Sequence, residues 1–175
     1  MKRFLIVVDM QKDFVDGALG TKEAVAIVPD VVEKIRRFDG EIIATLDTHD
    51  ADYLRSAEGK KLPVAHCIYH TEGWILNYEV AKALDKKEHI LLEKPTFGSV
   101  KLPALIEELA GDEPFSIELC GLCTDICVVS NALLLKAHFP EVPIAVDASC
   151  CAGVTPASHE AALTTMRMCQ IDVEG

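Results

Sequence analysis

Short apolar runs alternate with amphipathic segments along almost the whole chain. The apolar runs have the length of buried strands and lie at residues 4–8, 42–46, 89–92, 116–119, 143–146 and 169–173. The segments between them show helical spacing of apolar residues at 23–38, 75–84, 101–110, 125–138 and 156–168. Strands that are apolar on both faces and alternate with helices form parallel sheets covered on both sides. We therefore predict a single α/β domain over residues 1–175, a length that suits one core.

The charge of the chain excludes several classes of partner. Its formal net charge is −11, which argues against binding to nucleic acid or to anionic membrane surfaces. The apolar run at the N-terminus stops at Asp9, too early for a signal peptide, and no later stretch could span a membrane. Seven cysteines, an odd number, are typical of reduced thiols rather than of a disulfide framework. We expect a cytoplasmic protein.

Polar residues stand where several predicted strands end. Asp9 and Asp47 directly follow the first two apolar runs, Lys94 stands two residues beyond the third, and segment 118–134 covers the end of the fourth. The carboxyl ends of parallel strands meet at one edge of the sheet, where ligand crevices form. A lone Asp there is usually a turn former or a helix cap. Four strands that deliver Asp, Asp, Lys and Cys to one edge instead predict a functional site.

The segment ELCGLCTDICVVSNALL contains Cys120, Cys123 and Cys127, which suggest a redox pair, a zinc knuckle or one catalytic thiol. Cys120 belongs to the apolar strand, whereas both thiols of a redox pair stand at a helix start. A knuckle needs a second pair at ligand spacing, which the adjacent Cys150 and Cys151 lack. Cys127 falls in the first turn of the predicted helix, where free N–H groups and the helix dipole favour a thiolate. We predict Cys127 as a nucleophile on the solvent side and the other six cysteines as core residues.

The segment between residues 47 and 74 is long, polar and rich in His and Asp, and loops of this size are usually functional. Asp47 and His49 are two residues apart, so both point to one side if the strand continues. His66 follows them, with Glu58 in between. These side chains suit Zn²⁺, and also Fe²⁺ or Mn²⁺. On spacing alone, ordinary exposed loop histidines remain the alternative.

Three segments carry a resemblance to a known family. IVVDMQKDF, EKPTFGS and CGLCTDICV resemble the signature segments of the cysteine hydrolase (isochorismatase-like) superfamily, and the similarity extends from residue 3 to the end. The resemblance implies a six-stranded parallel sheet in a three-layer α/β/α sandwich, with Asp9, Lys94 and Cys127 as catalytic residues. It also implies a cis peptide bond at Leu122–Cys123 and an oxyanion hole made by the backbone N–H groups of Cys123 and Cys127. Since true isochorismatases lack the nucleophilic cysteine, its presence points to hydrolysis of a C–N bond.

The long loop resembles that of nicotinamidases within this superfamily. DTHD and LPVAH match segments that hold a metal ion there, which implies Asp47, His49 and His66 as ligands of Zn²⁺ and Glu58 as a fourth. Phe14 stands where an aromatic pocket residue is expected, and Trp74 is a candidate second wall. The resemblance thus implies conversion of nicotinamide to nicotinate and ammonia through a cysteine thioester, a step of NAD salvage in pyridine nucleotide biosynthesis. We further expect a small-molecule amide as partner and a homo-oligomer.

The chain also departs from the nicotinamidase pattern. Thr48 occupies a place where many relatives have an aromatic, Cys123 stands where Ala is common, and His70 replaces a common Gly. One extra residue precedes His66. These departures bear on the substrate more than on the reaction. Two alternatives therefore stay open: an amidase for another small amide or carbamoyl compound, and a zinc-binding or thiol-redox protein without hydrolytic activity.

Overall fold

A computed structural model describes residues 1–175 and contains one six-stranded sheet. The strands are β1 (Lys2–Val8), β2 (Glu41–Asp47), β3 (His89–Lys94), β4 (Phe115–Leu122), β5 (Ile144–Ala152) and β6 (Asp172–Glu174). All neighbours pair in parallel, in the order β3-β2-β1-β4-β5-β6. The predicted six-stranded parallel sheet is confirmed.

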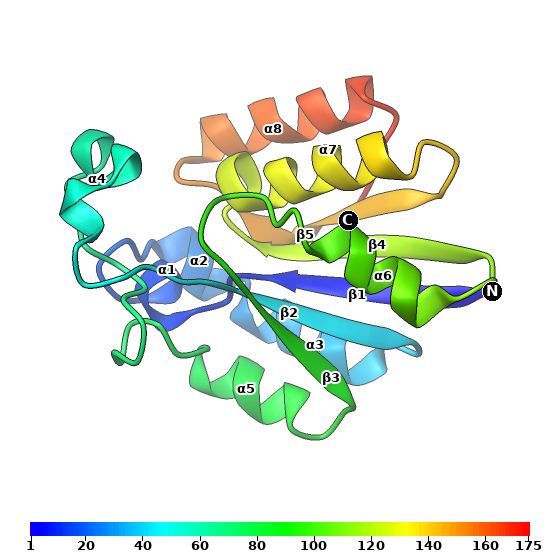
Figure 1. Ribbon diagram of the computed structural model, residues 1–175, viewed down its shortest axis with the longest axis horizontal. Coiled ribbons are helices and arrows are strands. Elements are labelled where there is room, and N and C mark those ends of the chain that lie inside the picture. The colour runs from blue at the N-terminus through cyan, green and yellow to red at the C-terminus, as the bar shows by residue number, and fades with distance from the viewer.

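Helices cover both faces of this sheet (Figure 1). One face carries α3 (Val28–Arg37) and α5 (Tyr78–Leu84), which pack against each other, and the short α2 (Lys22–Ala26). The other carries α6 (Leu102–Ala110), α7 (Val129–His138) and α8 (Pro156–Met168). The result is the predicted three-layer α/β/α sandwich.

The core lies between the layers and explains why these segments fold as they do. From Phe4 to Val8, β1 is fully buried, because this central strand is covered by helices on both faces. Helix α3 turns Val31, Val32 and Ile35 toward the sheet while its other side stays polar. The same apolar periodicity that predicts each element also buries it.

Several element boundaries differ from the sequence prediction. The single helix expected at 23–38 is divided at Ile27 into α2 and α3, with Pro29 in the first turn of α3, where a missing N–H costs nothing. The strand expected at 143–146 continues to Ala152. The last strand lies at 172–174 instead of 169–173, because α8 runs to Met168 and Gln170 adopts a left-handed conformation (φ 64°) that turns the chain.

The segment from 47 to 74 projects beyond the carboxyl edge of the sheet (Figure 1). It contains the 3₁₀ turn Tyr53–Arg55 and the short α4 (Ala57–Lys61), and it packs near α1 (Lys12–Val15), which follows β1. A hydrogen bond from the N–H of His49 to the carbonyl of Cys67 joins the first and last parts of this segment. Among the helices, none has both the length and the apolar character needed to cross a membrane.

Candidate active site

Three strands deliver the predicted catalytic side chains to one buried point. Asp9 follows β1, Lys94 ends β3, and Cys127 lies in a π-helical turn (Thr124–Val128) just after β4. The Lys94 ammonium lies 2.6 Å from Asp9 Oδ2 and 3.4 Å from Cys127 Sγ. All three side chains are buried. The structure therefore brings together residues that are distant in the sequence: Cys127 is 33 positions from Lys94 and 118 positions from Asp9.

The charges at this point determine where the protons reside. Burial raises the pKa of Asp9, although Lys94 and Thr45 oppose the shift. Burial would lower the pKa of Lys94, but Asp9, Cys127 and Asp47 together raise it above its ordinary value. Burial and the nearby Asp9 carboxylate raise the pKa of Cys127 well above that of a free thiol. These directions favour a neutral Cys127 thiol and a charged Lys94 ammonium in contact with the Asp9 carboxyl group.

This environment corrects two expectations for Cys127. The sequence analysis places its thiol on the solvent side with a thiolate favoured by the helix start, but the residue is only 4% exposed. The π-helical turn, in which the N–H of Val128 donates to the carbonyl of Cys123, carries Cys127 inward. Burial destabilises the thiolate of Cys127 by removing it from water, and this effect is larger than the stabilisation that the helix dipole gives in the first turn. The thiol therefore needs a base, and Asp9 is beside it.

Asp9 is held by a residue that the sequence analysis did not single out. The hydroxyl of Thr45 in β2 donates to Asp9 Oδ1 over 2.7 Å. In return, the backbone N–H of Asp9 donates to the hydroxyl and carbonyl oxygens of Thr45. Asp9 itself adopts a left-handed backbone conformation (φ 45°) directly after β1. A lone Thr inside the apolar run IIATL was the only sequence signal for this contact.

The backbone after β4 is arranged as the resemblance implies. The Leu122–Cys123 peptide bond is cis, and the N–H of Cys123 donates to no acceptor within the protein. Gly121 adopts φ 116°, and a Cβ there would lie 2.2 Å from the carbonyl oxygen of Val8. Only glycine lets β4 approach β1 this closely. The Cys123 N–H, four residues before Cys127, is left free to donate to a bound group.

The other six cysteines lie in the core, beside the site or at the surface. All seven are free thiols, and burial raises the pKa of Cys120 and of Cys151. Cys67, Cys120, Cys150 and Cys151 are buried, as predicted. One expectation was wrong, because Cys169, the residue that caps the C-terminus of α8, is exposed. Cys123 is half-buried and packs against the core.

A second group of polar side chains adjoins the catalytic three. Asp47 Oδ2 lies 2.9 Å from His49 Nε2 and 3.5 Å from His66 Nε2. Glu58 Oε1 lies 3.7 Å from His49 Nε2 and 3.6 Å from His66 Nε2. The Asp47, His49 and His66 ligand atoms all lie within 4.8 Å of one another, and the three residues are buried. The predicted metal ligands therefore do meet.

The donor set fits a divalent metal ion. His66 Nδ1 lies 2.8 Å from the carbonyl of Val64, so the bond fixes its proton there and leaves the Nε2 lone pair toward Asp47. The side-chain amide of Gln11 donates to the carbonyl of Asp47 and accepts from its N–H, which clamps the backbone of this ligand. Catalytic zinc sites use ligands of this kind, two imidazoles with a carboxylate, and leave one coordination position of the ion open. Lys94 connects the two groups, since its ammonium lies 3.4 Å from Asp47 Oδ1.

Aromatic residues surround this group. The Phe14 ring lies 5.4 Å from that of His66, between centroids, where the sequence analysis expects a pocket wall. Trp74 packs on Tyr69 and His70, donates to Thr48 beside Asp47 and lines a cavity beside α5, and its role as a second wall stays a prediction. Tyr53, which the sequence analysis missed, stacks against both His49 and His66 at 4.7 and 4.9 Å. No periodicity marked it, because it lies in a short 3₁₀ turn.

Comparison with known proteins agrees with this geometry. The Isochorismatase domain family matches residues 3–174. Isochorismatase domain-containing protein 2 of Xenopus laevis is 30% identical over 155 residues, which cover 86% of this chain and 71% of the relative. The crystal structure of nicotinamidase/pyrazinamidase PncA from Bacillus subtilis has a TM-score of 0.85 at 26% identity and covers both chains fully. The pyrazinamidase of Pyrococcus horikoshii in complex with zinc has a TM-score of 0.80 at 26% identity, over 99% of this chain and 98% of that one. The chain belongs to the isochorismatase family, as a nicotinamidase-like cysteine hydrolase.

Proposed function

We propose that this protein is an amidohydrolase that converts nicotinamide to nicotinate and ammonia. One observation carries the proposal: Lys94 links the Cys127 thiol, at 3.4 Å, to the Asp47 carboxylate of the metal-ligand group, also at 3.4 Å. The nucleophile and the group that would hold a metal ion and anchor the substrate therefore lie next to each other in one buried site. Solved structures named as nicotinamidases or pyrazinamidases support the choice of substrate. The reaction would serve NAD salvage in the cytoplasm.

The residues of the chain supply each proton transfer. Asp9 accepts the thiol proton of Cys127, and Lys94 stabilises the charge that both share. The sulfur attacks the carboxamide carbon, and the N–H groups of Cys123 and Cys127 stabilise the oxyanion. The C–N bond then breaks, Asp9 returns its proton to the leaving ammonia, and a thioester remains. Asp9 next activates water, which releases the acid and restores the thiol.

Asp47, His49 and His66 would hold the metal ion, with Glu58 3.6 to 3.7 Å from the two imidazoles. When bound, the ion would supply a Lewis acid for the ring nitrogen of the substrate. We propose Zn²⁺, because two neutral imidazoles and a carboxylate suit it, while Fe²⁺ and Mn²⁺ are compatible with the same ligands. Tyr53 and Phe14 pack against the histidines and hold their rings in place.

The test is to incubate the purified protein with nicotinamide and to measure ammonia and nicotinate. We expect the two products in equal amounts. A protein that releases ammonia only from carbamoyl compounds would favour the alternative amidase, and the absence of ammonia from every small amide would contradict the hydrolytic function. Elemental analysis of the same preparation should find about one divalent ion per chain.

A further inference from the structure

Strand β3 forms an open edge of the sheet. It is the first strand in the order β3-β2-β1-β4-β5-β6 and pairs only with β2. The carbonyl of Lys94 accepts from the N–H of Thr48, which follows β2, so the backbone of Lys94 faces inward. The N–H and C=O groups of successive residues in a strand point alternately to its two edges. Those of His89, Leu91 and Glu93 therefore point outward, away from β2. None of these three makes a backbone hydrogen bond outside the ladder with β2.

The surface beside this edge is apolar. Leu91 is 51% exposed, and Ile75 and Tyr78 are 50% and 72% exposed. All three line a cavity of about 500 Å³ between β3 and α5, most of whose lining residues are hydrophobic. A free edge with exposed apolar side chains is a template for pairing with another strand.

We propose that β3 pairs with β3 of a second copy of this chain, antiparallel, about a two-fold axis at Leu91. Each Leu91 then faces Leu91 of the other copy, and each His89 faces the other copy's Glu93, because the two numbers of every opposed pair sum to 182. These outward residues exchange both backbone hydrogen bonds with their partners. The two sheets join into one, and the carboxyl ends of the two β3 strands point in opposite directions.

Charge complementarity selects a second copy as the occupant. His89, Leu91 and Glu93 share one face of β3, so the two-fold register sets an imidazole against a carboxylate at both ends and leucine against leucine in the centre. His89 Nδ1 lies 3.0 Å from the carbonyl of Lys87, which leaves Nε2 for the opposing Glu93. The paired edge also covers the apolar cavity beside α5.

The first test is covalent. Residues of a hydrogen-bonded antiparallel pair have Cα atoms about 5.5 Å apart, within the range of a disulfide. Leu91→Cys should therefore form a covalent dimer under mild oxidation, seen on a non-reducing gel. Val154→Cys, at a residue that is 50% exposed on another part of the surface, should form none beyond the wild-type background. Equal cross-linking of both variants would overturn the proposal.

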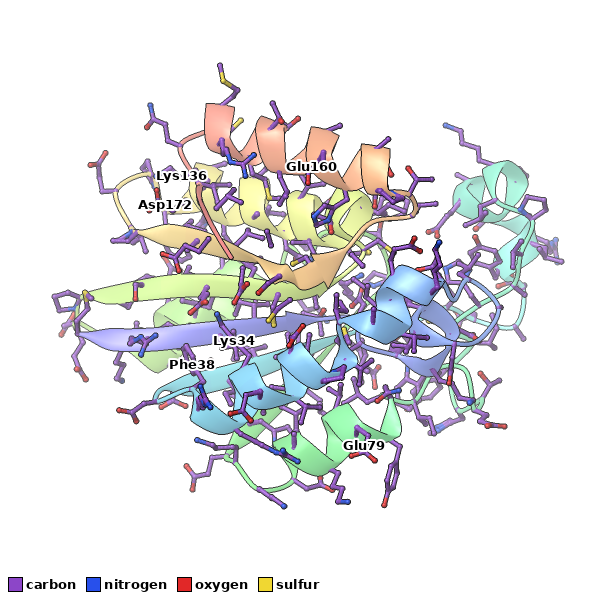
Figure 2. The ribbon with its side chains drawn as sticks, turned by 180° about the vertical axis from the view of Figure 1, so that it is seen from behind. Lys34, Phe38, Glu79, Lys136, Glu160 and Asp172 are labelled. Atoms are coloured by element: carbon purple, nitrogen blue, oxygen red, sulfur yellow. The ribbon has the colours of Figure 1, made fainter.

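The second test swaps charges and reads molar mass by sedimentation equilibrium. We expect the wild type to be a dimer at micromolar concentration. His89→Glu and Glu93→Lys should each weaken the dimer at least tenfold, because they oppose like charges or lose the pair, and the double variant should restore it. Glu160→Lys on α8, labelled in Figure 2, changes charge as much and should leave the dimer unchanged. A wild type that stays monomeric, or a dimer indifferent to both single changes, would refute the pairing.

Discussion

At the scale of single residues, Lys94 connects the chemistry to the anchoring group. Its ammonium is buried and contacts Asp9, Cys127 and Asp47. Two carboxylates and a developing thiolate would repel one another in a buried site, and the cation between them offsets this repulsion. The reactivity of Cys127 therefore depends on Asp9 as a base more than on its helix.

Replacing the nucleophile should separate turnover from stability. Cys127→Ala should lower kcat by about 10⁴-fold or more, since removing a nucleophile leaves only residual catalysis. Cys120→Ala should keep turnover but lower the free energy of unfolding by about 1 kcal/mol or more, because Cys120 fills the core of β4. Ammonia release and urea unfolding measure the two effects. Near wild-type ammonia release from Cys127→Ala would contradict the assignment.

Loss of one metal ligand should appear in metal content before it appears in rate. Asp47→Ala or His49→Ala should leave little of the roughly one ion per chain expected in the wild type. KM should rise strongly, and kcat should fall too, because a misplaced carbonyl also slows the chemistry. Elemental analysis together with initial rates checks this. A metal-free wild type with full activity would show that the ion plays no part.

At the scale of elements, Asn131 joins the helix of the nucleophile to the loop after the lysine strand. Its side-chain amide donates to the carbonyls of Cys127 and Phe97, and its Oδ1 accepts from the N–H of Ser99. The residue is fully buried. It therefore fixes α7 and the end of β3 relative to each other, and with them Cys127 and Lys94.

Removing this link should affect kcat more than KM. Asn131→Ala leaves a buried N–H and two carbonyls without partners, so the free energy of unfolding should fall by about 1–3 kcal/mol. We expect kcat to fall about tenfold or more, because small displacements of a reacting group are costly. Ser130→Ala, one residue earlier on α7, is the control. Unchanged kcat in folded Asn131→Ala would show that Lys94 and Cys127 are held by other contacts.

At the scale of the whole molecule, an ion-pair cluster fastens α3 to the sheet, away from the active site. Lys34 of α3, labelled in Figure 2, contacts Glu118 of β4 and Asp147 of β5. Lys34 lowers the pKa of Asp147, with help from Ser149, against the effect of burial. The Lys34–Asp147 pair therefore contributes to stability only while the Asp147 carboxyl is ionised.

This linkage gives the pH dependence a definite sign. The folded pKa of Asp147 lies below the unfolded value of about 3.9, so its contribution is full above that value and is lost as pH falls through the folded pKa. Asp147→Asn should destabilise the fold by about 1–2 kcal/mol at pH 7. The gap between variant and wild type should close below about pH 4. Thermal unfolding at several pH values measures the gap; a gap that does not shrink at all between pH 7 and pH 2 would exclude the carboxylate as its source.

The spacing between thiol and metal ligands, determined by how β1, β2, β3 and β4 are placed, should select the substrate. Nicotinamide and pyrazinamide both carry a ring nitrogen meta to the carboxamide-bearing carbon and should both be hydrolysed. Benzamide lacks this nitrogen and picolinamide has it in the ortho position, so both should be slower by a factor on the order of 10². Ammonia release at equal concentrations compares the four. Equal rates for nicotinamide and benzamide would contradict anchoring by a metal ion.

Much of this protein could be predicted from the sequence because it depends on local pattern. Alternating apolar runs and helical periods predicted the six parallel strands, and the chain order placed Asp9, Asp47, Lys94 and Cys127 at one sheet edge. Parallel strands leave no other place for residues that follow them. Boundaries set by turns, such as the end of α8, were less accurate.

Only the tertiary structure decided the environment of these residues. The burial of Cys127 and the support of Asp9 by Thr45 depend on segments far apart in the chain. The packing of Tyr53 on His49 and His66 depends on how the loop folds back on itself. The packing of Trp74 on Tyr69 and His70 likewise follows from the path of the loop and not from its composition. The pKa of a group follows desolvation and neighbouring charge. Both quantities exist only once β1, β2, β3 and β4 lie side by side, so sequence determined the reactive groups and packing determined their protonation.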